Sequence, residues 1–235
     1  MFIGNEHMPV IMVLRGISDN CHIVGGAVRD HLLGDKPKDI DLVCDVPYDI
    51  LKDAYIDAGF KVKEAGRQYN VLHVSLNGQH YEISNYRSDM GNEGGKIGTL
   101  EEDAQRRDFT INAIYYNLHT HEYEDPNGKG LEDIRSRLLR FVGSASSRVQ
   151  EDPLRVWRFY RLLQTKDLVA DKRSLTAVRH MFKDATNKVS PERIRNELEK
   201  NDTRNLDEPI RRTNKDTGKD ERQEGTIDVC TAAGQ

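Results

Sequence analysis

"GGAVRDHLLGDKPKDIDLV", residues 25–43, is the stretch on which the predicted fold depends. The apolar run CHIV just before it predicts a strand, Gly25 and Gly26 predict a turn, and AVRDHLLG predicts a short helix that ends at Gly34. This order lets backbone N–H groups approach a phosphate at the positive end of a helix. A plain tight turn is the alternative, because a Gly-Gly pair before a helix is common.

The second half of the stretch predicts a strand with two different faces. Side chains two residues apart point to the same side of a strand, so Asp39 and Asp41 project together while Ile40 and Leu42 enter the core. Two carboxylates this close repel each other, and magnesium prefers a few carboxylates together with phosphate oxygens. We therefore expect Asp39 and Asp41 to bind magnesium beside a nucleoside triphosphate. A solvated strand end is the alternative for an isolated D-x-D.

The composition limits where the protein works. Among 235 residues, 37% are hydrophobic and 31% charged, and the net charge of -4 gives no global attraction to nucleic acid. The three cysteines, Cys21, Cys44 and Cys230, have neither the spacing of a metal site nor that of a disulfide framework. The chain shows no secretory signal and no run of eighteen apolar residues. We expect a cytoplasmic protein with no membrane partner.

Periodicity divides the chain into three parts. We predict a mixed α/β unit at 1–135, a helical unit at 136–200 and a polar, disordered tail at 201–235. Further predictions are a strand or helix at 8–15, a helix at 48–59, strands at 61–66, 70–76 and 79–87, a mobile glycine-rich loop at 88–99, helical structure at 100–117, and a turn and loop at 122–134.

Three later stretches accompany the first in a fixed order: LEEDAQRRDFTINA at 100–113, EDPLRVWRFYRL at 151–162 and SPERIRNELEK at 190–200. Together with residues 25–43 they resemble the class II nucleotidyltransferases, the family of tRNA CCA-adding enzymes and bacterial poly(A) polymerases. The resemblance implies an α+β fold, in which a polymerase-beta-like head of mixed sheet and helices is followed by an all-helical neck.

The second motif supplies candidate nucleotide ligands. Arg106 and Arg107 carry fork-shaped donors suited to phosphate or ribose oxygens, and Asp108 and Asn112 are spaced one helical turn apart. A solvated helix start is the alternative, which we favour for Arg106. The resemblance implies that Arg107 contacts the nucleotide and that Asp108 and Asn112 help to hold its sugar and triphosphate. It also implies that Arg29 binds nucleotide after the Gly25-Gly26 turn.

The third motif predicts a helix that reads the base. Asp152, Arg155, Arg158 and Arg161 recur every three residues and would share one face. The Asp152 carboxylate accepts and the Arg155 guanidinium donates, which matches the amino group and ring nitrogen of cytosine and adenine. Uracil or guanine would leave buried donors or acceptors without a hydrogen bond, and each such group would cost about 1 to 3 kcal/mol of binding free energy. The alternative is an intrahelical ion pair worth about 0.2 to 0.5 kcal/mol. The resemblance implies that Asp152 and Arg155 read CTP and ATP, and we expect Arg158 and Arg161 to help hold the nucleotide.

Two further features support contact with RNA and metal. Seven arginines at 135–161 form a basic stripe suited to triphosphate and RNA backbone, although a solvated helix face is the alternative for Arg135 and Arg137. Glu82 lies on a predicted strand that could neighbour the Asp39–Asp41 strand, and is a candidate third catalytic carboxylate or a surface residue. The eight histidines form no metal-ligand pattern.

The predicted function is template-independent addition of C and A to the tRNA 3′ end. CTP and ATP would be the substrates, pyrophosphate would be released, and two magnesium ions would be held by Asp39 and Asp41. The partner is tRNA, and no protein partner is predicted. A CC-adding enzyme, for which the loop at 88–99 looks short enough, and a poly(A) polymerase remain open alternatives. A non-catalytic RNA-binding protein is a further one.

Overall fold

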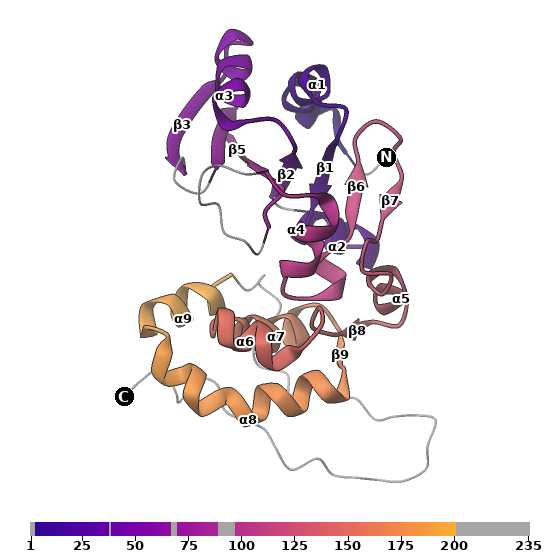
Figure 1. Cartoon of the computed structure of the whole chain (residues 1–235), viewed down its shortest axis with the longest axis vertical. Helices are drawn as coiled ribbons and strands as arrows, with labels where there is room; N and C mark the ends of the chain where they lie inside the picture. Colours follow the sequence, from indigo (N-terminus) through magenta and orange to yellow (C-terminus); the bar gives the residue numbers. More distant parts are fainter. Residues whose placement is uncertain (1–2, 38, 67–69, 89–96, 201–235) are drawn as a thin grey trace.

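The computed structural model describes residues 3–37, 39–66, 70–88 and 97–200, and all structural statements refer to these residues. The predicted tail and the centre of the predicted loop at 88–99 lie outside them. Figure 1 shows a sheet-bearing part, from indigo to magenta, above a group of helices in orange. The mixed-sheet head followed by a helical region is confirmed, while the boundary near residue 135 stays a prediction.

One mixed sheet of seven strands organises the upper part (Figure 1). Its spatial order is β3-β4-β5-β2-β1-β6-β7, and only the β2–β5 pair is parallel. The strands are β1 Cys21–Val24, β2 Ile40–Cys44, β3 Lys61–Gly66, β4 Val71–Leu76, β5 Gln79–Asn85, β6 Tyr115–Asn117 and β7 Tyr123–Glu124. The predicted strands at 21–24, 61–66, 70–76 and 79–87 are confirmed. The strand predicted around the two aspartates is β2, in the middle of the sheet; it begins at Ile40, so it contains Asp41 and Asp39 lies just before it.

The helices surround the sheet and continue below it (Figure 1). In the upper part they are η1 Asn5–His7, α1 Met8–Ile17, α2 Gly26–Leu33, α3 Tyr48–Asp57, α4 Leu100–Arg106, η3 Thr110–Asn112 and α5 Gly130–Arg135. The lower part contains α6 Ala145–Glu151, α7 Arg155–Thr165, α8 Lys172–Lys188 and α9 Pro191–Leu198, with the short parallel pair β8 Leu138–Leu139 and β9 Val169–Ala170. No helix among the described ranges is long and apolar enough to cross a bilayer.

Local chemistry explains where several elements begin and end. The ambiguous segment at 8–15 is the helix α1, which has Pro9 in its first turn, where the ring costs no hydrogen bond. Helix α2 ends at Gly34, whose φ of +86° suits a glycine cap, as predicted. Thr99 and Glu102 form a reciprocal capping box that starts α4.

Two predictions of local structure are wrong. The segment at 100–117 is not helical throughout: α4 ends at Arg106, and Tyr115 and Tyr116 belong to β6, because they pair with Val24 and Ile23 of β1. Backbone pairing with a central strand overrides the helical spacing of the sequence. The segment at 122–134 is not only turn and loop, since it contains β7 and α5.

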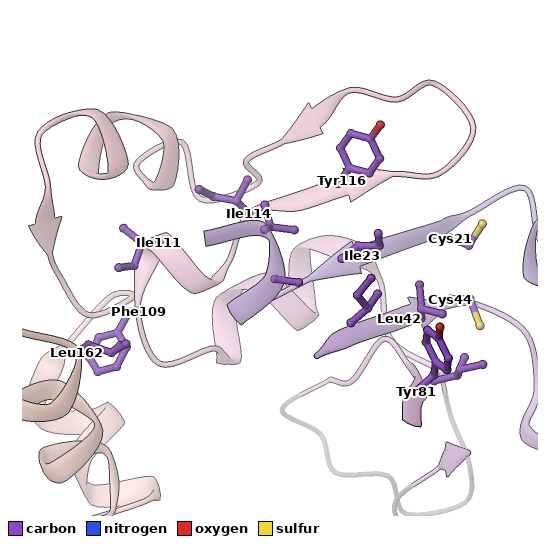
Figure 2. Packing of buried hydrophobic residues seen from close by; sticks show 14 of the residues in the cluster. Cys21, Ile23, Leu42, Cys44, Tyr81, Phe109, Ile111, Ile114, Tyr116 and Leu162 are labelled. Carbon is purple, nitrogen blue, oxygen red and sulfur yellow. The ribbon is translucent and has the colours of Figure 1, made fainter. Parts of the chain in front are cut away.

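The core runs without a break from the sheet into the helical region. Ile40 and Leu42 are buried on the face of β2 opposite Asp41, as predicted. Figure 2 shows Ile23 and Leu42 of this cluster on neighbouring strands, with Phe109 further along. Phe109 contacts Phe141 at 4.7 Å between ring centroids. The shared core fixes α7 relative to the sheet.

Candidate active site

The glycine turn brings three functional groups together. Gly25 caps α2 with φ +78° and ψ −132°, a conformation that residues with a Cβ rarely adopt. A Cβ placed there would lie 3.6 Å from Nη1 of Arg107 and 3.6 Å from Oδ2 of Asp41. The start of α2, where Gly26 lies, the carboxylate of Asp41 and the guanidinium of Arg107 therefore meet at one point.

The surroundings of Asp41 disfavour the charged form of its carboxylate. It pairs in register with Val24 on β1 and with Glu82 on β5, and Asp39 lies two residues before it on an exposed segment. Burial, then the charge of Glu82, raises the pKa of Asp41 to about 6 against the opposing charge of Arg107, and Asp39 adds to the rise. Negative charge is crowded at this strand, as the sequence predicted.

This donor set fits a hard divalent cation. Magnesium is bound in proteins through one or two carboxylates and the phosphates of a substrate, so Asp39 and Asp41 have the right chemistry. Glu82 is on the neighbouring strand, but its side chain is 62% exposed and lies 3.8 Å from Nδ1 of His73. Across the described ranges no group of three carboxylate, His or Cys side chains is placed to hold one ion. The catalytic role of Glu82 stays a prediction.

Arg29 is fixed inside the molecule by two acceptors. Its side chain is buried, and it donates from Nη1 to Oδ1 of Asn112 at 2.9 Å and from Nε to Oδ1 of Asp30 at 2.8 Å. Asn112 in turn donates to Oδ1 of Asp108 at 2.9 Å. Arg29, predicted from the first motif, is thus connected to Asp108 and Asn112, predicted as a pair from the second.

The prediction that Asp108 and Asn112 lie on one face of a continuous helix is wrong. Helix α4 ends at Arg106 and η3 begins only at Thr110, so Asp108 lies in the bend between them. Their side chains meet nevertheless, because this bend turns the Asp108 carboxylate toward both Asn112 and the backbone N–H of Phe109.

The same group continues into the helical region. Arg158 on α7 donates from Nη1 to Oδ2 of Asp108 at 2.9 Å. Glu197 on α9 is almost fully buried and accepts from Arg161 at 2.9 Å, and it lies 3.6 Å from Nε of Arg158. Burial opposes ionisation of Asp108, but Arg158 and Asn112 outweigh it and lower the pKa of that carboxyl. We call Arg29, Asp108, Asn112, Arg158, Arg161 and Glu197 the arginine network.

A cavity of about 290 Å³ lies between α2, β2 and α7. It is lined by four cationic and three anionic side chains, with small residues between them. These residues are Gly26, Ala27, Arg29, Asp30, Asp39, Asp41, Arg161, Thr165, Lys166 and Lys200. The predicted metal ligands, the glycine turn and two predicted nucleotide-binding arginines therefore share one space.

Lys166, Asp30 and Glu197 were missed by the sequence analysis. Nζ of Lys166 lies 3.1 Å from Asp30 and 3.0 Å from Asp35, and so joins the end of α7 to α2. These partners are more than a hundred residues apart in the chain, and no spacing rule connects them. Glu197 lies inside a quoted motif, but only its burial beside two arginines indicates its role.

The prediction that Asp152 shares a helix face with the three arginines is wrong. Asp152 is the C-terminal cap of α6 and α7 begins at Arg155, because Pro153 disfavours a helical conformation of the residue before it. Asp152 has φ −140° and ψ 98°, which is extended. Arg155, Arg158 and Arg161 do lie on one helix.

Asp152 and Arg155 each contact other groups. Arg155 donates to Oε2 of Glu151 at 2.7 Å and to the carbonyl oxygen of Arg106 at 3.1 Å. Asp152 accepts from the backbone N–H of Leu154 at 3.2 Å and lies 3.5 Å from Nη2 of Arg193. Their joint reading of a base stays a prediction, and neither lines the cavity described above.

Residues 21–140 match the family described as the poly A polymerase head domain. The chain is 31% identical to poly(A) polymerase I of Haemophilus influenzae over 190 residues, covering 74% of this chain and 41% of the relative. It is 30% identical to the CCA-adding enzyme of Lactobacillus helveticus over 200 residues, covering 82% of this chain and 48% of the relative. The chain thus spans less than half the length of each.

A solved structure shows the same fold. The crystal structure of the Bacillus stearothermophilus CCA-adding enzyme in complex with CTP superposes with a TM-score of 0.73 at 28% identity. The match covers 84% of this chain and 48% of that one.

Proposed function

The chain belongs to the class II nucleotidyltransferase family, and on that premise we propose that it adds C and A residues to the 3′ end of tRNA, using CTP and ATP without a template. The observation that carries the proposal is that Asp39, Asp41, the start of α2 and two arginines of the network line the same cavity. A triphosphate needs cationic donors and a backbone turn, and a reacting phosphate needs carboxylates that bind cations.

The reaction is an in-line displacement at the α-phosphate. The RNA 3′-hydroxyl gives its proton to water and its oxygen forms a bond to the α-phosphorus. The bond from that phosphorus to the oxygen that bridges the α- and β-phosphates breaks, and pyrophosphate leaves with that oxygen. Mg²⁺ bound by Asp39 and Asp41, two ions by our proposal, would supply Lewis-acid stabilisation of the charge on these oxygens. The chain itself provides the N–H groups of the Gly25-Gly26 turn and the guanidinium groups of Arg107 and Arg161, which orient the triphosphate.

Base selection is assigned to Asp152 and Arg155. The carboxylate accepts and the guanidinium donates, which matches the amino group and ring nitrogen of cytosine and adenine. Arg155 lies on the same helix as Arg158 and Arg161, so the base and the phosphates would contact successive turns of α7. To bind a base, Asp152 and Arg155 exchange their present contacts with Arg193 and Glu151 for contacts with its edge.

Poly(A) addition is the second candidate function. The chain is as similar to a poly(A) polymerase as to a CCA-adding enzyme, with 31% and 30% identity. CCA addition and poly(A) addition proceed by the same in-line displacement, and they differ in which nucleotides are added and which RNA is extended. A CC-adding reaction is the third candidate.

The test is extension of defined RNA ends. Purified chain is incubated with magnesium and either a tRNA that ends at its discriminator base or an unrelated RNA, with CTP, ATP, GTP or UTP singly and mixed, and the products are sequenced. We expect CCA on the tRNA alone. Two C residues followed by a stop would assign CC addition, and A tracts on either RNA would assign poly(A) addition. If neither RNA is extended, the proposed function is wrong.

A further inference from the structure

Asp103 is a buried carboxylate in the second motif to which no role has been assigned. It lies on α4 with 2% of its surface exposed, four residues before Arg107. Burying a charge is costly unless it is paired and hydrogen-bonded. The residues that pair with the Asp103 carboxylate therefore indicate its role.

The Asp103 carboxylate holds one edge of the Arg107 guanidinium. Oδ2 accepts from Nη2 at 2.7 Å and from Nε at 3.0 Å, a two-point contact that fixes the plane of the group. Tyr115 on β6 completes the arrangement: its hydroxyl donates to the same Oδ2 at 2.6 Å and accepts from Nε of Arg107 at 3.0 Å. The guanidinium carbon also lies 5.3 Å from the centre of the Tyr115 ring, which favours a cation.

The other edge of Arg107 faces the glycine turn. Nη1 lies 3.6 Å from the position that a Cβ on Gly25 would take, and Oδ2 of Asp41 lies at the same distance from that position. Nε and Nη2 are bound to Asp103 and Tyr115, so Nη1 is the nitrogen that faces the start of α2. Backbone N–H groups at the start of a helix can bind a phosphate, and Nη1 would bind the same phosphate.

Asp103 is itself fixed to the sheet. Its second oxygen, Oδ1, accepts from the backbone N–H of Arg87 at 3.2 Å, just after β5. Burial opposes ionisation of Asp103, but the charge of Arg107 and the hydrogen bond of Tyr115 outweigh it and lower the pKa of that carboxyl. The carboxylate is therefore charged at neutral pH, and it contacts Arg107, Tyr115 and the backbone of Arg87, with Nε of Arg106 3.5 Å from Oδ1.

We propose that Asp103 and Tyr115 are positioning residues, which clamp Arg107 by Nε and Nη2 so that Nη1 meets a phosphate of the incoming nucleoside triphosphate at the Gly25 turn. Neither residue touches the nucleotide; both act through Arg107. The inference rests on the proposed function for the identity of the anion, and its geometry is independent of which base or RNA is used.

The test compares Tyr115→Phe and Asp103→Asn with a matched control. Tyr115→Phe keeps the ring and removes only the hydroxyl. Asp133→Asn is the control, because Asp133 is an equally buried carboxylate, bound to Thr110 at 2.7 Å and Arg140 at 3.1 Å, that holds no residue of the site. The KM for nucleotide, kcat, the Kd for magnesium-CTP by calorimetry and thermal unfolding are measured for each.

We expect a KM and Kd about tenfold higher for Asp103→Asn and about threefold higher for Tyr115→Phe, with kcat changed much less. Asp133→Asn lowers the melting temperature and leaves both constants unchanged. Wild-type constants in a folded Tyr115→Phe variant, or an equal rise of KM in the Asp133→Asn control, would overturn the proposal.

A double-mutant cycle separates positioning from general destabilisation. In an Arg107→Ala background, Asp103→Asn adds no further rise in the Kd for magnesium-CTP, because the group it positions is gone. If Asp103→Asn raises the Kd by the same factor in the Arg107→Ala background as in the wild type, the inference is contradicted. If the wild-type chain binds magnesium-CTP but extends no RNA, the proposed function fails and the clamp is still judged on these binding constants. If the wild-type chain binds no nucleotide, both are overturned.

Discussion

Asp41 and Asp108 are two carboxylates of the same site with opposite electrostatics. Asp108 belongs to the arginine network, where Arg158 and Asn112 lower its pKa against the effect of burial. Asp41 lies on β2, where burial and then the charge of Glu82 raise its pKa to about 6. The arginine network thus contains the cations that balance its carboxylates, whereas Asp41 lies close to the negative charges of Glu82 and Asp39, which the charge of Arg107 does not offset. We infer that the network is complete in the free protein and that Asp39 and Asp41 receive their cations from solution.

The largest effect is expected at the carboxylate pair. Asp41→Asn removes the charge that a divalent cation needs, and we expect the rate of nucleotide addition to fall about a thousandfold or more. The rate is measured by single-nucleotide extension at saturating magnesium, with circular dichroism to establish the fold. A variant that keeps a rate within tenfold of the wild type would contradict the metal assignment.

The second effect concerns the stability of the arginine network. Asp108→Asn removes the carboxylate nearest to Arg158 and leaves that guanidinium with Glu197 at 3.6 Å, and we expect unfolding to be easier by about 3 kcal/mol at neutral pH. Because the folded-state pKa of Asp108 is below its ordinary value of 3.8, its contribution is present above that value and is lost as the pH falls through the folded pKa.

Urea denaturation of both proteins at neutral and acid pH measures this difference. We expect the gap in unfolding free energy to be wide at neutral pH and to close in acid. A gap that does not depend on pH would show that Asp108 contributes through packing and not through its charge.

A smaller effect is expected at the base-reading end of α7. Arg155→Lys keeps the charge and removes the donor fork, so we expect discrimination against UTP and GTP to fall about tenfold while the rate with the correct nucleotide changes less. Arg148→Lys is the matched control, since Arg148 binds the same Glu151. Equal misincorporation by both variants would remove Arg155 from base selection.

The smallest effect is expected for Glu82. Its side chain is largely exposed, so Glu82→Gln removes mainly a neighbouring charge, and we expect the rate of nucleotide addition to change by less than about tenfold. Single-turnover extension measures it. A loss as large as that of Asp41→Asn would instead make Glu82 a third catalytic carboxylate.

The sequence predicted the local parts of this site well. Alternation placed Ile40 and Leu42 in the core and Asp41 opposite them, and the glycine pair predicted the turn and the start of α2. The first prediction depends on the two-residue period of a strand and the second on the conformational freedom of glycine, and both properties are local to a few residues.

The features of the site that the sequence did not predict depend mostly on contacts between segments distant in the chain. Tyr115 became a strand residue by pairing with Val24, and this placed its hydroxyl beside Asp103. Lys166 meets Asp30 only because α7 packs across the cavity from α2. The separation of Asp152 from α7 has a local cause in Pro153, which the three-residue spacing concealed.

The central claim is that Asp39 and Asp41 bind a divalent cation from solution, and a magnesium titration followed by thermal unfolding tests it most directly. Without divalent ions at neutral pH, we expect Asp41→Asn to melt above the wild type, because an ionised carboxylate with a raised pKa costs stability. Magnesium with CTP then raises the melting temperature of the wild type and hardly changes that of the variant. Equal responses to magnesium in the two proteins would contradict the account.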